Sequence, residues 1–373
     1  MNRVIGLIFG NTRSDLLQGL TQDRPIVALP FGGKYRLLDF ALSSFINSGI
    51  RTVGLITPQN YRPVLDHTGA GKDWYLDRKS GGLFILPGVI HGLSGGHSRF
   101  LMQNMTSNLE FLEKDSAENV VITYCNQVYN IDYQEALYFH ELKKADVTLI
   151  YKESEQEEDL QRRLLLSLNV EHKVNTIAQN WDQEESLSEV PYFVDMLIIR
   201  RELFIELIER YKSIETADLI DAIRENIDQI EVYAHPTKAY IGRINSIEDY
   251  FRCNMDLLKP EVSQELFQSK NQIYTKVRDN PPSLYCSTPK VRNSLLSCDC
   301  TLDGEVEHSI ISRGVIIKPG AKVKNCILMQ KCIIGENAVL ENVILDKFVE
   351  VKEGNVLVGR RESPLVISKK SIV

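Results

Sequence analysis

Over the first 250 residues, short apolar runs alternate with stretches in which apolar side chains recur every three or four positions. The short runs predict strands, which we place at Val4–Phe9, Thr52–Ile56, Val120–Tyr124, Val147–Tyr151 and Tyr192–Ile199. The recurring pattern predicts helices, which we place at Arg36–Asn47, Glu202–Tyr211 and Ala217–Ile227. Strands separated by helices are typical of a mostly parallel sheet covered on both faces, so residues 1–254 are expected to form an α/β domain.

Two segments depart from this pattern. Residues 153–190 carry acidic clusters at both ends, and we interpret them as surface loops or a short hairpin with solvated charges. Residues 255–290 end a helical stretch and contain the rigid run Asp279-Asn-Pro-Pro-Ser283. This second segment is the predicted linker between two domains.

From residue 291 to residue 373 the apolar positions repeat. The period is 17 and then 16 residues, and it defines three predicted columns: Val306, Val323 and Val339; Ile310, Ile327 and Val343; Ile316, Ile333 and Val349. Each unit can bury its aliphatic side chains only against the neighbouring units. The spacing therefore predicts a parallel β-helix, with an ordinary sheet of short strands as the alternative.

Composition narrows the class of protein. The chain has 373 residues, of which 43% are hydrophobic and 25% charged, as in a globular protein of two domains. A net charge of -7 argues against a general nucleic-acid binder. No apolar run approaches the roughly 20 residues that span a bilayer, and the first residues lack the apolar core of a signal peptide. We therefore expect a cytoplasmic protein that contacts neither membrane nor nucleic acid.

The run from Phe31 to Ile50, FGGKYRLLDFALSSFINSGI, closely resembles the signature of the glucose-1-phosphate adenylyltransferases. The resemblance covers nearly the whole chain and implies a nucleotidyltransferase domain followed by a left-handed β-helix. The family joins ATP and glucose 1-phosphate to give ADP-glucose and pyrophosphate. Charge develops on the transferring phosphoryl group, and Mg²⁺ on aspartates together with Arg or Lys stabilises it.

The phosphate-binding loop of the family is altered here. Its glycine-rich pattern aligns with residues 11–17, which contain no glycine and place Asp15 where phosphates would lie. Arg13 matches the first catalytic arginine of the family, and the alternative is an exposed arginine at a strand end. The phosphate-directed lysine is replaced by Ile26.

Both metal-binding aspartates of the family are also replaced. The first aligns with Asn126, after the strand Val120–Tyr124, and the second with Arg243. The net charge of the pocket thus changes from about -2 to about +1. At a distance of ~4 Å and an effective dielectric near 20, each unit of this charge is worth roughly 4 kcal/mol per unit of charge on the metal ion. The chain is therefore expected to bind no metal and to have no intact catalytic set.

The resemblance then points to a GlgD-type, non-catalytic subunit. Such a subunit is expected to assemble with a catalytic subunit into a hetero-oligomer, a tetramer, and to regulate it allosterically; alone it could form a homo-oligomer. Only the catalytic partner would need Mg²⁺. Arg24 and Arg36 match family positions that bind anionic effectors, and Lys34 follows two glycines near them. The alternatives are a surface arginine for Arg24, a capping or ion-pair role for Arg36, and helix capping for Lys34.

Two other functions remain open. An active nucleotidyltransferase with a rearranged site would need carboxylates elsewhere, and Asp15 and Asp195 are the nearest candidates. A β-helix acyltransferase would use His308 and bind coenzyme A. His91 and His97 flank a glycine-rich run that we interpret as a mobile loop.

Overall fold

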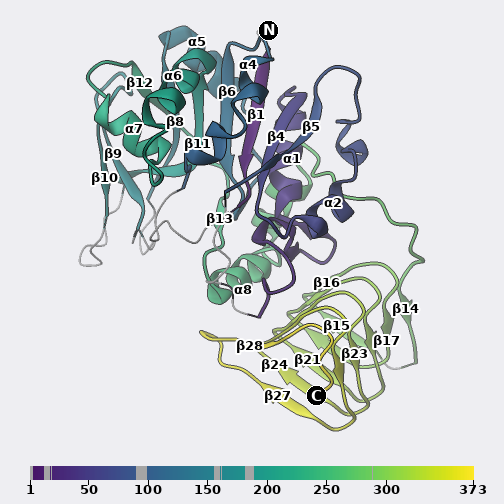
Figure 1. Ribbon diagram of the computed structural model, residues 1–373. Coiled ribbons are helices and arrows are strands. Elements are labelled where there is room, and N and C mark those ends of the chain that lie inside the picture. Colours follow the sequence, from purple (N-terminus) through teal and green to yellow (C-terminus); the bar gives the residue numbers. More distant parts are fainter. Residues whose placement is uncertain are drawn as a thin grey trace.

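The computed structural model describes residues 3–11, 17, 19–89, 99–154, 160, 162–180, 189–287 and 289–373. An α/β domain is followed by a β-helix, and the two domains pack against each other (Figure 1). Both predicted architectures are confirmed. None of the helices in the described part of the chain is both long and apolar enough to cross a membrane.

The α/β domain is built on a nine-stranded sheet with the order β10-β9-β11-β6-β1-β4-β5, in which β8 pairs with β11 and β12. The neighbours β6, β1, β4 and β5 are parallel, and β11 runs antiparallel to β6 and β8. The strands are β1 (Val4–Phe9), β4 (Thr52–Thr57), β5 (Gly82–Pro87), β6 (Asn119–Tyr124), β8 (Val147–Glu153), β9 (Leu164–Leu168), β10 (Val174–Gln179), β11 (Pro191–Arg200) and β12 (Val232–Pro236). All five predicted strands are present. For residues 153–190, where surface loops or a short hairpin were expected, the structure has a hairpin formed by β9 and β10.

Helices cover both faces of this sheet, and the faces follow the strand alternation. In β1, Ile8 packs with α1 in one apolar cluster, whereas Leu7 and Phe9 pack with α6 and α7 in a second. The main helices are α1 (Leu37–Asn47), α2 (Arg62–Thr68), α5 (Gln134–Lys143), α6 (Arg201–Tyr211) and α7 (Leu219–Glu225); α3 (Gln103–Thr106) and α4 (Leu109–Glu113) are short. The three predicted helices correspond to α1, α6 and α7.

The predicted linker is more structured than its composition suggested. Helix α8 (Ile247–Asp256) is followed by α9 (Pro260–Phe267), whose Phe267 stacks on Tyr35 at 5.0 Å between ring centroids. The extended segment after α9 is tied to the α/β domain, where the Nζ of Lys276 donates to the carbonyl of Asp66. The first β-helix strand, β14, begins at Leu284, earlier than residue 291.

The β-helix has three parallel sheets of five strands each. The first contains β14 (Leu284–Tyr285), β17 (Thr301–Leu302), β20 (Ile316–Ile317), β23 (Ile333–Ile334) and β26 (Glu350–Val351). The second contains β15 (Lys290–Arg292), β18 (Glu305–Glu307), β21 (Lys322–Lys324), β24 (Val339–Glu341) and β27 (Val356–Val358). The third contains β16 (Leu295–Leu296), β19 (Ile310–Ile311), β22 (Ile327–Leu328), β25 (Val343–Leu345) and β28 (Leu365–Ile367).

The third member of each predicted column is wrong by one residue. Val323 pairs with Leu340, Ile327 with Ile344 and Ile333 with Glu350, so the period stays at 17 residues. Only the Val306 column points into the coil. The Ile316 column faces outward, and the Ile310 column packs on the α/β domain. A shift of one residue reverses the face of a strand, and apolar residues occur here on both faces, which obscured the register.

The third sheet joins the two domains. Ile310, Ile327 and Ile344 are fully or almost fully buried in the apolar cluster that also contains α1. The strands β2 (Pro30–Phe31) and β3 (Tyr35–Arg36) form a hairpin, and a side chain at its Gly33 would contact the carbonyl of Ile311. The signature run Phe31–Ile50 therefore lies where the β-helix meets the α/β domain.

Candidate functional site

Asn126 lies at the carboxyl edge of the sheet, two residues beyond the end of β6. The chain then forms β7 (Gln127–Val128), which pairs with β13 (Gly242–Arg243) and sets Gln127 opposite Arg243. The side-chain amide of Asn126 donates to the Oδ1 of Asn245 at 2.7 Å, and the main-chain carbonyl of Asn126 accepts from the backbone N–H of Ile244 at 2.8 Å. The two positions identified from the sequence are thus neighbours in space.

Arg243 shares a carboxylate with a second arginine. An Nη atom of Arg243 lies 3.8 Å from Oδ2 of Asp195, and the Nε of Arg99 lies 2.7 Å from Oδ1 of the same residue. Asp195 is buried in β11 with a φ of 58°, where the pairing of β11 with β8 is interrupted. Arg99 is also held by its hydrogen bond to the carbonyl of Arg162 at 2.7 Å. Asp195 is therefore neutralised by two fixed guanidinium groups.

The electrostatics at this site favour anions. Burial, together with the charges of Arg163 and Arg99, lowers the pKa of Arg243 to about 10, although the Asp195 carboxylate opposes this shift. Arg243 is nevertheless protonated at neutral pH. Among the described residues, the guanidinium groups of Arg99 and Arg243 thus face the single carboxylate of Asp195, a net charge of about +1.

These side chains do not fit a divalent cation. Mg²⁺ prefers carboxylate and other oxygen ligands, whereas Asn126 contributes a neutral amide and Arg243 a cation. The described residues contain no group of three or more His, Cys, Asp or Glu side chains placed to hold a metal ion. No step of a metal-assisted reaction can be assigned to this arrangement.

The remaining residues of the expected site lie elsewhere in the structure or outside its described part. Ile26 is buried in the apolar core within a short 3-10 helix, Ile26–Ala28, so it is a packing residue here. Arg13, Asp15, His91 and His97 lie outside the described residues. His308 sits at a bend between β18 and β19, where its Nδ1 lies 2.8 Å from the side-chain amide of Asn293.

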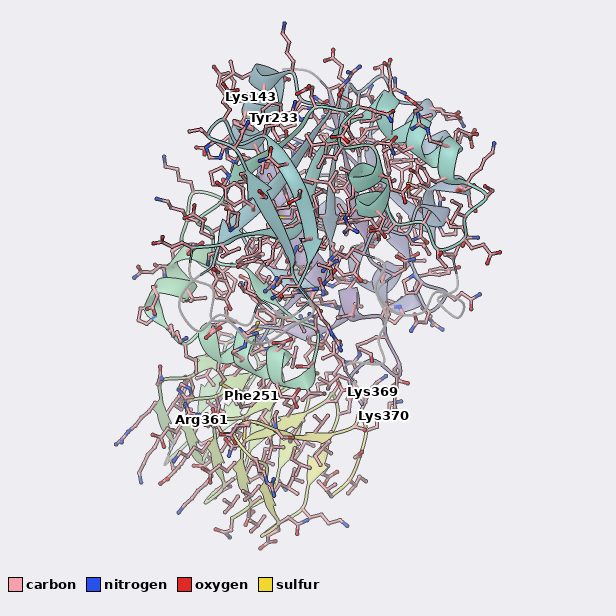
Figure 2. The ribbon with its side chains drawn as sticks, turned by 90° about the vertical axis from the view of Figure 1, so that its left-hand side faces the viewer. Lys143, Tyr233, Phe251, Arg361, Lys369 and Lys370 are labelled. Atoms are coloured by element: carbon pink, nitrogen blue, oxygen red, sulfur yellow. The ribbon has the colours of Figure 1, made fainter. Side chains whose placement is uncertain are left out.

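A second charged cluster lies at the domain junction. Arg24 forms a bidentate ion pair with Asp346 of the β-helix, with Nη2–Oδ distances of 2.6 and 2.7 Å. Both side chains are almost completely buried, at 5% and 1% exposure. The alternative of Arg24 as a surface arginine is therefore wrong. Near it, the half-buried Lys369 of the β-helix pairs with the exposed Asp23 at 2.9 Å, and Figure 2 labels Lys369 and Lys370 where the domains meet.

Four more basic side chains surround the Arg24–Asp346 pair. Arg36 precedes α1, donates to the carbonyl of Pro63 at 2.7 Å, and has its pKa lowered to about 10 by burial, although Asp39 opposes this shift. Burial and the charges of Arg36 and Arg24 lower the pKa of Lys347 to about 7. Arg278 and Arg313 add to the same field. Lys34 is exposed, and its Nζ lies 4.8 Å from the centre of the Tyr35 ring.

Comparison with known proteins decides the family. Residues 6–160 match the family model described as nucleotidyl transferase, and residues 285–363 match the one described as GlmU-like, C-terminal hexapeptide. Over 369 residues the chain is 32% identical to the glycogen biosynthesis protein GlgD of Bacillus subtilis, covering 99% of this chain and 96% of that protein. It is also 32% identical to the glucose-1-phosphate adenylyltransferase of Fervidobacterium nodosum, covering 95% of this chain and 85% of that protein.

The chain belongs to the glucose-1-phosphate adenylyltransferase family of glycogen biosynthesis. The glucose-1-phosphate adenylyltransferase of Bacillus cytotoxicus is a further relative, 27% identical over 97% of this chain and 96% of that protein. The family signature occupies the domain junction in this member, and the left-handed β-helix packs on it through the third sheet.

Several residues of the two charged clusters could not be identified from the sequence of this family member. Arg99 follows a glycine-rich run with no pattern of its own, and Arg278, Arg313, Asp346 and Lys347 lie in the linker or at bends of the β-helix. The signal that could have identified Asp346 is its position: it directly follows the aliphatic run Val343-Ile-Leu345, and a carboxylate that is buried beside such a run needs a partner.

Proposed function

We propose that this chain is a regulatory subunit without adenylyltransferase activity of its own. The observation that carries the proposal is the position of Arg243, whose guanidinium shares Asp195 with Arg99 beside the Asn126 amide. A triphosphate that is being cleaved needs a divalent metal ion beside it, whereas this site offers arginine side chains. The alternative of an active enzyme with a rearranged site gains no support from Asp195, because both its oxygens face arginines.

The β-helix supplies a surface for a partner. Of its three sheets, the third is buried on the α/β domain, and the second carries a largely charged outer surface that includes Lys290, Glu305 and Lys322. The first sheet has an outer column that is mostly apolar, namely Leu284, Thr301, Ile316 and Ile333, and that ends in the exposed Glu350. Such a column fits the β-helix of a catalytic subunit of the same family. The proposed assembly is a hetero-oligomer, a tetramer, in which only the catalytic subunit uses Mg²⁺.

Enzyme assays test the proposed role directly. The purified chain with Mg²⁺, ATP and glucose 1-phosphate is expected to form ADP-glucose more than about 10³-fold more slowly than the catalytic subunit of the same genome. Adding the chain to that subunit is expected to raise its activity and shift its effector response. Replacing Ile316 and Ile333 with lysine should abolish both effects, whereas Lys322→Glu on the second sheet should not. Robust turnover by the chain alone would refute the proposal.

The junction cluster, defined as Arg24, Arg36, Arg278, Arg313 and Lys347, is the proposed site for an anionic effector. Its four arginines, together with Lys347 when that side chain is protonated, outnumber the carboxylates of Asp23, Asp39 and Asp346 among the described residues, so a bound phosphate or sulfate group would relieve repulsion between the cations. The cluster joins both domains, which allows a bound anion to change how the β-helix sits on the α/β domain. The proposed site includes Arg24 and Arg36, which the sequence indicated as residues that bind an anionic effector. Lys34, whose side chain is exposed, is not included in the junction cluster.

Sulfate is expected to raise the melting temperature of the chain, and more at pH 6 than at pH 8. The charge of sulfate is constant in this range, whereas Lys347, with a pKa of about 7, gains its proton toward pH 6 and then attracts the anion. Arg36→Ala and Arg313→Ala should remove the effect, and Arg292→Ala, on the charged second sheet, should retain it. Differential scanning fluorimetry at both pH values measures these shifts. An equal shift in all variants would contradict the site.

Without an anion, Lys347 should also make stability depend on pH. Its folded pKa is depressed, so between pH about 7 and the ordinary lysine pKa of about 10.4 the unfolded chain binds more protons, and stability rises with pH. Below pH 7 both states are protonated and the full penalty remains. Lys347→Met should flatten the rise in urea unfolding curves between pH 7 and pH 9. The same slope in this variant would show that another group causes it.

A further inference from the structure

A cavity of about 510 Å³ opens at the amino edge of the central sheet, at the end of the α/β domain remote from the β-helix (Figure 1). It is lined by the first residues of β1 and β4, the turn between α1 and β4, the segment before β5 and one face of α5. Asn126 lies at the opposite edge, about 20 Å away, since each residue of β6 adds about 3.3 Å. The cavity is thus separate from the adenylyltransferase-type site, and its volume suits a small molecule.

Hydrogen bonds between elements fix the walls of this cavity. The backbone N–H of Tyr133, just before α5, donates to the Oγ of Ser48 at 2.8 Å. The backbone N–H of Gly82 donates to the carbonyl of Arg51 at 2.8 Å. At Gly81 a Cβ would lie 2.7 Å from the same carbonyl, so only glycine allows the two segments to approach this closely. The cavity is therefore a preformed part of the fold, as ligand sites usually are.

The charged side chains of the cavity favour an anion. Its lining contains three guanidinium groups and one carboxylate, contributed by Arg3, Arg51, Arg78 and Glu141. Arg3 pairs at 3.0 Å with Asp115, which lies outside the lining, so two arginines remain against Glu141, a net charge of about +1. Arg51 is held in place because its Nη1 donates to the carbonyl of Ile46 at 2.6 Å. Guanidinium groups bind phosphate and carboxylate oxygens through several N–H donors at once.

An apolar wall lies beside these arginines. Ile50 and Leu137 line the cavity and are almost completely buried, and the half-buried Val4 lies in the same wall. Tyr138 of α5 also lines the cavity and is 69% exposed, which leaves its ring available to a flat ligand. An inorganic anion would leave this wall in water, and a neutral ring would leave the arginines unmatched. The cavity therefore fits a ligand that combines both features.

We propose that this cavity binds a small aromatic anion, a molecule in which a planar ring carries a phosphate or carboxylate group. The ring would pack on Leu137 and Tyr138, and the anionic group would bond to Arg51 and Arg78. The junction cluster includes Arg36, before α1, whereas the cavity lies beyond the other end of that helix. The two sites are therefore distinct, and the inference does not depend on the regulatory role.

Isothermal titration calorimetry of the full chain with phenyl phosphate and with benzoate tests the site. The probe that binds more tightly identifies the anionic group. It is expected to bind at least about tenfold more tightly than phenol or than its ring-free counterpart, inorganic phosphate or acetate, because it alone uses the arginines and the apolar wall together. Arg78→Ala and Tyr138→Ala should each weaken binding of this probe about tenfold.

Matched variants on the β-helix are the controls. Arg292→Ala and Tyr285→Ala remove the same types of side chain from exposed positions and should leave binding of the probe within about twofold of wild type. Arg313→Ala, in the junction cluster, should also leave it unchanged, which separates this test from that of the effector site. Circular dichroism and melting curves establish that each variant is folded.

Three results would overturn the proposal. The first is a probe that binds no more tightly than its ring-free counterpart. The second is equal binding by the Arg78→Ala and Arg292→Ala variants. The third is loss of binding in Arg313→Ala, which would place the probe at the junction cluster instead of the cavity.

Discussion

Replacing Arg24 with alanine is expected to lower the free energy of unfolding by about 3–5 kcal/mol. The guanidinium bonds both oxygens of Asp346 at 2.6 and 2.7 Å, and both side chains are almost completely buried. Without Arg24, the Asp346 carboxylate stays in a place that water barely reaches. It then retains a hydrogen bond from the backbone of Lys347, at 2.6 Å, and the more distant charges of the junction cluster. Urea unfolding followed by fluorescence and circular dichroism measures the loss.

The nearby exposed pair is the matched control. Lys369 and Asp23 also link the two domains, but Asp23 is 57% exposed, so Asp23→Asn should cost less than about 1 kcal/mol. The double variant Arg24→Met/Asp346→Leu removes both charges and should recover much of the stability lost in Arg24→Ala. If Arg24→Ala and Asp23→Asn have equal effects, the buried ion pair does not hold the domains together.

The double variant Asn126→Asp/Arg243→Asp is expected to bind Mn²⁺ at least about 100-fold more tightly than the wild-type chain. The two substitutions change the local charge by three units, and each unit at ~4 Å is worth roughly 4 kcal/mol per unit of ion charge before screening. Asp195 keeps its partner Arg99 at 2.7 Å, so the strand should remain in place. Isothermal titration calorimetry with MnCl₂ provides the measurement and needs no enzymatic activity.

A change of equal charge elsewhere is the control. Arg292→Asp/Asn293→Asp makes the same substitutions on the β-helix and should leave Mn²⁺ binding at the wild-type level. In EDTA the Asn126→Asp/Arg243→Asp variant should melt at a lower temperature than wild type, because its new carboxylates repel Asp195, and Mn²⁺ should reverse this. Tight Mn²⁺ binding by the wild-type chain, lost in an Asn126→Ala variant, would contradict the proposed absence of a metal site.

The secondary structure could be predicted well from the sequence in those segments where one pattern of apolar residues dominates. β1 is buried on both faces and reads as a continuous apolar run, so its bounds could be predicted to the residue. α1 has a regular apolar face, and the β-helix repeat is visible in its first two coils. In the third coil, Val339-Leu340 and Val343-Ile344 offer two apolar candidates for each position. There the pattern could not fix the register.

By itself, the sequence determined the two domains and the family signature, and it predicted that Asn126 and Arg243 replace both metal-binding aspartates. Only the tertiary structure decided what those residues contact. Asp195 meets Arg99 and Arg243 because β11 lies beside β6 in the sheet, and Arg24 meets Asp346 because the β-helix folds back onto the first domain. Such pairs join residues far apart in the chain, and no local periodicity encodes them. They form only when strand order and domain packing bring buried charges together, since each needs a partner once water is excluded.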